Sequence, residues 1–134
     1  MADDATREAF LSQANIAVLS TIGPGGGPHA VPIWYLYEDG VFRISISRGS
    51  QKHKNVEREP RVALVVDQRE RPYYSLTVMG SAEIGPGFTP DERLRLATRY
   101  LGDELGKQYT ERTQGGDPVT IVFRADHLLE YDPP

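Results

Sequence analysis

Residues 41–55 read VFRISISRGSQKHKN, a stretch that combines a strand pattern, a bend and the start of a helix. Apolar and polar residues alternate over 41–47, which predicts a β-strand with one buried face. That buried face carries Phe42, Ile44 and Ile46. The opposite face carries Ser45 and Ser47, whose short side chains leave room for a molecule to lie against the strand.

The bend at residues 47–52 has the chemistry of a phosphate site. Gly49 permits a tight turn, and a helix pattern begins at or just after Ser50. The first turn of a helix presents unpaired N–H groups and a positive dipole end, which favour an anion. The Ser50 hydroxyl can donate a hydrogen bond, Lys52 adds a cation, and Arg48 can add a planar fork of donors. The same residues also suit a capping serine followed by solvated charges.

Five further strand-like segments surround this stretch, at residues 16–22, 29–37, 61–67, 73–84 and 119–124. Short helices are expected at residues 4–13, 51–58, 89–101 and 103–111, and a polar tail ends the chain. Turn signals at 23–28 and at Asp39-Gly40 join neighbouring strands into hairpins, which implies antiparallel pairing. We therefore predict a mainly β (α+β) fold with six antiparallel strands that close into a barrel flanked by short helices. The size predicts one domain over residues 1–134.

Composition narrows the choice of function. The 134 residues contain no cysteine, which rules out disulfides, a thiolate nucleophile and cysteine-based zinc sites. A net charge of -4 argues against a nucleic-acid partner. Between Arg48 and Arg58, however, four basic residues accompany one acidic residue, so this segment is locally positive. The contrast indicates a small anionic ligand.

The sequence also bears on location and metals. The first thirty residues lack the pattern of a signal peptide, and no run approaches the roughly 18 apolar residues that a membrane span needs. We expect a cytoplasmic protein without a membrane partner. His29, His53 and His127 fall on separate elements without ligand spacing, so no metal site is expected. Of the three, only His29 is considered as a proton donor.

Five segments follow one another along the chain in an order that resembles a known family. They are Ala17–Ile22, Gly27–Tyr35, Arg48–Asn55, Glu59–Val62 and Gly80–Glu83. This ordered set resembles the pyridoxamine 5′-phosphate oxidase-like split β-barrel family, which binds FMN or a deazaflavin. The similarity is greatest to the branch that uses coenzyme F-420. Ser50 stands where some relatives have arginine, so the choice between F-420 and FMN stays open.

The resemblance implies a homodimer with the cofactor at the subunit interface and its phosphate near Ser50 and Lys52. The ring would lie against the first strands. The residues implied to contact the cofactor are Thr21, Val31, Pro32, Ile33, Trp34, Ser47, Arg48, Ser50, Gln51, Lys52 and Asn55, with Tyr73, Tyr74 and Ser75 reaching it from the partner subunit. For Trp34, Tyr73 and Tyr74, ordinary packing is an alternative role.

The expected activity is that of an oxidoreductase that transfers hydride between the deazaflavin ring and an unknown small molecule. No catalytic residue is assigned, because the cofactor supplies the chemistry. The alternatives are an FMN-dependent oxidase or reductase of the same fold, and a protein that binds flavin, deazaflavin or haem without turnover.

Overall fold

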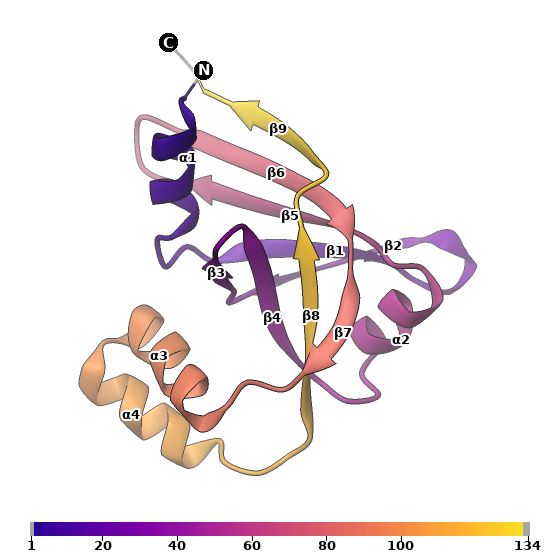
Figure 1. Cartoon of the computed structure of the whole chain (residues 1–134), viewed down its shortest axis with the longest axis vertical. Coiled ribbons are helices and arrows are strands. Elements are labelled where there is room, and N and C mark those ends of the chain that lie inside the picture. The colour runs from indigo at the N-terminus through magenta and orange to yellow at the C-terminus, as the bar shows by residue number, and fades with distance from the viewer. Residues whose placement is uncertain (1, 133–134) are drawn as a thin grey trace.

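The computed structural model describes residues 2–132 of the chain (Figure 1). Its strands are β1 (Ala17–Ile22), β2 (Pro28–Ile33), β3 (Leu36–Glu38), β4 (Val41–Ser47), β5 (Arg61–Gln68), β6 (Tyr74–Ser81), β7 (Glu83–Pro86), β8 (Pro118–Arg124) and β9 (His127–Tyr131). Its helices are α1 (Asp4–Leu11), α2 (Gln51–Arg58), α3 (Pro90–Leu101) and α4 (Asp103–Arg112), with a short 3-10 turn at Pro24–Gly26. None of the described helices has the length and apolar character needed to cross a bilayer.

The strands form two antiparallel sheets. The five-stranded sheet has the order β2-β1-β5-β6-β9, and the four-stranded sheet has the order β3-β4-β8-β7. The Asp39-Gly40 turn joins β3 to β4 with both residues at positive φ, as a tight hairpin requires. This is the predicted mainly β split barrel with flanking helices.

Two of the expected strands change sheet. The segment 29–37 divides into β2 and β3 around Trp34 and Tyr35, and the segment 73–84 divides into β6 and β7 at Ala82. In each case the first half belongs to the five-stranded sheet and the second half to the four-stranded sheet. The expected polar tail forms β9, which pairs with β6. The six expected strands therefore appear as eight segments, and β9 makes nine within the described residues.

Gly80 lies at the second corner, where β6 passes closely against the end of β8. A Cβ atom at this position would overlap the carbonyl oxygen of Arg124 and lie 3.1 Å from the Phe123 ring. Only a residue without a side chain allows the two strands to approach so closely.

The apolar core lies between the two sheets and is closed at one end by α1. Phe10 and Leu11 of α1 are buried against the strands. Tyr35, at the first corner, is also fully buried, and its hydroxyl donates a hydrogen bond of 2.8 Å to the Leu11 carbonyl. This contact ties the corner between β2 and β3 to the helix that caps the barrel.

The α3–α4 hairpin packs beside the four-stranded sheet (Figure 1). The contact buries a second, smaller apolar cluster, formed by Leu36, Phe88 and Leu96. Thr89 caps α3 and shares a capping box with Glu92. The Glu92 carboxylate also lies 2.7 Å from the Arg43 guanidinium of β4. These contacts hold the hairpin at a defined position over β4.

Replacing Gly80 by alanine is expected to destabilise the fold by about 1–3 kcal/mol, because the added methyl group must displace backbone. The free energy of unfolding in urea measures the effect. Gly27→Ala is the matched control, since Gly27 has a φ of -73° and no atom within 4 Å of an added Cβ. Equal stability of the Gly80→Ala variant and the wild-type protein would contradict the close approach of β6 and β8.

Candidate functional site

The 47–52 bend takes the form that its sequence predicts. Gly49 has a φ of 78°, and Ser50 caps α2 with its hydroxyl oxygen accepting from the His53 N–H at 3.4 Å. The His53 side chain is buried, and its Nδ1 accepts the Gly49 N–H at 2.8 Å. His53 therefore holds the backbone of the bend in place, a role that its position in the sequence did not indicate.

The four basic residues around the bend differ in their partners. The Arg48 Nε donates to an Asp117 carboxylate oxygen at 2.7 Å, and an Arg58 nitrogen donates to the Ile22 carbonyl oxygen at 2.5 Å. Lys52 is half-buried and Lys54 is exposed. Neither lysine has a hydrogen bond or ion pair within residues 2–132. Lys52 is thus a half-buried lysine in the first turn of α2 and has no protein counterion in this region.

Thr21 and Asn55 are fully buried and bind each other. The Asn55 Nδ2 donates to the Thr21 hydroxyl oxygen at 3.0 Å, and the Gln51 side chain donates to the Asn55 Oδ1 at 2.6 Å. Their polar groups are engaged within the protein, so both residues act by fixing α2 against β1. Gln51 is exposed at the first position of α2.

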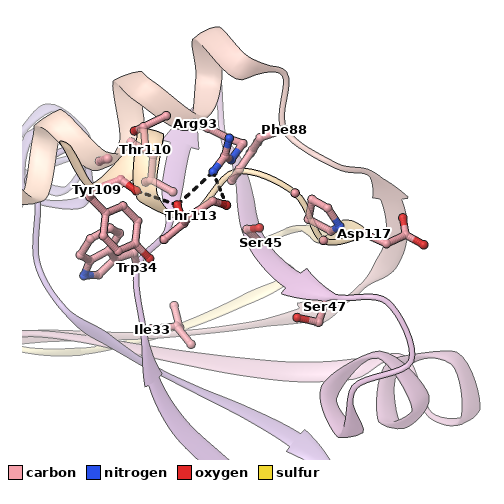
Figure 2. Close-up of a pocket in the computed structure, with 15 residues that line it drawn as sticks. Ile33, Trp34, Ser45, Ser47, Phe88, Arg93, Tyr109, Thr110, Thr113 and Asp117 are labelled. Carbon is pink, nitrogen blue, oxygen red and sulfur yellow. Dashed lines mark hydrogen bonds between the residues drawn. The ribbon is translucent and has the colours of Figure 1, made fainter. Parts of the chain in front are cut away.

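A cavity of about 400 Å³ lies between β4, the end of β2 and the α3–α4 hairpin (Figure 2). We call it the α3–α4 cavity. Three residues expected to contact the cofactor line it: Ile33, Trp34 and Ser47. Ser45 also lines it, so the open strand face predicted from Ser45 and Ser47 borders a real cavity. Asp117, the partner of Arg48, completes the wall nearest the bend.

Trp34 is held rigidly at the other end of this cavity. Its ring stacks on Tyr100 with centroids 4.8 Å apart and planes at 4°, and Tyr109 lies 5.2 Å away. The Tyr100 hydroxyl accepts from the Tyr35 N–H and donates to the Asn15 carbonyl at 2.8 Å. Burial raises the pKa of the Tyr100 hydroxyl, so this group stays protonated at neutral pH and keeps its role as a donor.

Side chains alternate between the two faces of β2, so the residues of β2 that are expected to contact the cofactor point in opposite directions. Val31 and Ile33 are half-buried, whereas Pro32 lies on the opposite, exposed face. The pairing of β2 with β1 agrees with this assignment of faces, because Val31 lies opposite the buried Leu19 and Pro32 lies opposite Val18. Only part of the 31–34 segment can therefore face one ligand within a single chain.

The three residues expected to act in the partner's site lie far from α2 in their own chain. They occupy the start of β6, beside α1, at the other end of the barrel (Figure 1). Tyr74 points inward, packs edge-to-face on Phe10 and donates to a Glu130 carboxylate oxygen at 2.6 Å. Burial and this carboxylate raise its pKa. Tyr73 is 49% exposed, and Ser75 is half-buried on the outer face of the sheet.

The residues on the α3–α4 side of the cavity were not predicted from the sequence. Arg93, Tyr109 and Thr113 line it together with the apolar residues of α3. These residues follow the bend by more than forty positions and form no motif with it. The small residues at 45 and 47 indicated an open space, but only the fold shows which elements enclose it.

Two antiparallel sheets that form a split barrel, with a cavity close to the 47–52 bend, define the structural class of this protein. The family model described as pyridoxamine 5′-phosphate oxidase matches residues 3–129. The chain therefore belongs to this family. No curated protein sequence matches at the significance applied.

Solved structures support the same assignment. The conserved hypothetical protein Rv2991 from Mycobacterium tuberculosis is similar with a TM-score of 0.79 and 25% identity, over 98% of this chain and 86% of that one. A protein described as an F420 reductase gives a TM-score of 0.74 and 28% identity, over 91% of this chain and 94% of that one. HutZ, a haem storage protein from Vibrio cholerae, gives a TM-score of 0.69 and 15% identity, over 96% of this chain and 94% of that one. The last likeness shows the fold alone.

Replacing Asn55 by alanine is expected to lower the free energy of unfolding by about 1–3 kcal/mol, because the buried Thr21 hydroxyl loses its donor. Chemical denaturation measures this loss. Gln51→Ala is the control, since it removes a part-buried hydrogen bond from an exposed residue to the same Asn55 side chain. A stability change below about 0.5 kcal/mol in Asn55→Ala would show that the buried bond does not fix α2.

Proposed function

We propose that the protein binds coenzyme F-420 at the 47–52 bend and transfers hydride between the deazaflavin ring and a small molecule. The observation that carries this proposal is Lys52, a half-buried lysine in the first turn of α2 without a partner among the described residues. A bound phosphate would supply the missing counterion, and the first N–H groups of α2 would add donors. When bound, the coenzyme supplies the hydride.

The adjoining residues fit a flat ring compound. Ser45 and Ser47 present only short side chains to the α3–α4 cavity, and Ile33 and Trp34 add apolar surface. In this proposal Ser50 and Lys52 hold the phosphate, while the cavity excludes water from the ring. His53 and the Thr21–Asn55 pair keep the bend in position without contacting the ligand.

FMN also carries a phosphate, so the bend alone does not distinguish it from F-420. Two observations favour F-420: the likeness to a protein described as an F420 reductase, at 28% identity, and the exposed Lys54 cation close to the bend. A free lysine at this position suits the anionic glutamyl tail that F-420 has and FMN lacks. An FMN-dependent oxidase or reductase of the same fold is the second candidate, favoured by the family description.

Titrating the purified protein with F-420 and with FMN, followed by fluorescence, tests this proposal. Lys52→Ala is expected to weaken binding about 10- to 100-fold, because a charge-assisted hydrogen bond to phosphate is lost. Lys54→Ala is the control and is expected to leave FMN affinity unchanged. Tight FMN binding without an F-420 response would contradict the F-420 assignment, and binding of neither would contradict the site.

We further propose that the protein works as a cytoplasmic homodimer through the outer face of its five-stranded sheet. Register aligns Val65, Thr77 and Leu129 across three neighbouring strands on that face. Leu129 is 55% exposed, and the other two residues are half-buried. An apolar sheet surface of this kind is typical of a protein interface. Ser75 lies on the same face, which would let it approach the partner's cofactor.

Leu129→Arg is expected to convert the dimer to a monomer, because a charge would be buried at the interface without a partner. Light scattering coupled to gel filtration measures the molar mass. Leu105→Arg is the matched control, since Leu105 is 58% exposed on α4, away from this sheet. A wild-type protein that elutes as a monomer, or a dimer that Leu129→Arg leaves intact, would refute the interface.

A further inference from the structure

The α3–α4 cavity contains a cation that no residue of the bend supplies. Arg93 of α3 lines the cavity, and its NH2 group donates to the Thr113 carbonyl and hydroxyl oxygens at 3.0 and 3.1 Å. Figure 2 shows its guanidinium group beside Thr113, on the opposite side of the cavity from Ile33. The Thr113 hydroxyl in turn donates to the Tyr109 carbonyl at 2.8 Å. Arg93 is therefore oriented by neutral groups.

The other arginines near the hairpin have different partners. Arg95 binds the Glu38 carboxylate at 2.9 Å, and Arg43 binds that of Glu92. Arg99 donates to the Gln13 carbonyl. Arg93 forms no ion pair within residues 2–132, and its Nε and NH1 groups have no hydrogen-bond partner there. The Nε–H bond points toward the NH2 side of the guanidinium, so Nε and NH1 do not form a fork. The NH1 group, which has no partner in the described chain, is the one that can donate to an anion such as a carboxylate in the cavity.

The surroundings of Arg93 favour a ligand with a flat apolar body. Phe88 and Leu96 provide apolar walls, and Trp34 and Tyr109 form an aromatic wall at the same end of the cavity (Figure 2). Rigid aromatic faces bind planar rings well, and an apolar environment strengthens the attraction between a cation and an anion.

We propose that the α3–α4 cavity recognises planar aromatic carboxylates, with the carboxylate on Arg93 and the ring against Trp34 and Tyr109. This inference rests on the proposed function in one respect: such a compound would be the substrate of the bound coenzyme. Arg93 then determines specificity, because it selects for a negative charge at the end of the cavity away from the 47–52 bend.

Trp34 is the only tryptophan in the chain, so its fluorescence reports directly on this end of the cavity. The probes are 4-nitrobenzoate and 4-nitrobenzamide, which quench tryptophan and differ chiefly in charge. The wild-type protein is expected to bind the benzoate at least about tenfold more tightly than the amide. Arg93→Gln is expected to abolish this preference and leave the affinity for the amide unchanged.

Arg95→Gln, on the same helix, is the control and is expected to retain the preference for the benzoate. Equal wild-type affinities for the two probes, or a preference that survives in Arg93→Gln, would overturn the inference. Equal weakening of both probes in Arg93→Gln would also overturn it, because a structural loss through Thr113 would then explain the result.

Because quenching needs no cofactor, the two proposals can fail separately. Failure of F-420 and FMN to bind, with the preference for the benzoate intact, would refute the proposed function and support the anion site at Arg93. Cofactor binding that depends on Lys52, without any preference for the benzoate, would refute only the role of Arg93.

Discussion

The buried hydrogen bond between Asn55 and Thr21 sets the position of α2, and the rest of the site depends on that position. Thr21 belongs to β1, which lies between β2 and β5 in the five-stranded sheet, whereas Asn55 belongs to the helix that begins at the bend. An unpaired polar group in this place would be costly, so the helix cannot slide without losing the bond. The position of Lys52 relative to the barrel follows from this constraint.

The two corners of the barrel create the space beside the bend. Because the chain leaves the five-stranded sheet after Ile33, Trp34 comes to lie outside both sheets and stacks on Tyr100. Because it changes sheet again after Gly80, β7 leads directly into the α3–α4 hairpin. One side of the cavity is therefore made of strands and the other of helices.

Much of this arrangement could be predicted from local sequence. The alternation over 41–47, the glycine bend, the Ser50 cap and the Asp39-Gly40 hairpin depend on neighbouring residues, and the structure shows each of them. The strand breaks at Trp34 and Ala82 could not be predicted, since both sheets demand the same alternation on either side of a corner. The tail was predicted wrongly because β9 is short and the strand that it pairs with, β6, lies far from it in the sequence.

The residues of the candidate site were likewise only partly predictable from the sequence. The shape of the bend was predictable because a glycine turn and a capped helix start are built from consecutive residues. Arg93 and Tyr109 were not, since tertiary packing alone brings them opposite Ser45. The buried position of Asn55 and the half-buried position of Tyr74 likewise depend on long-range partners, Thr21 and Glu130.

A crystal structure of the protein with F-420 or FMN tests the central claim most directly. The account predicts the phosphate at the start of α2, within hydrogen-bonding distance of the Lys52 ammonium group and the Ser50 hydroxyl. A ligand phosphate bound elsewhere, with Lys52 directed into solvent, would contradict it.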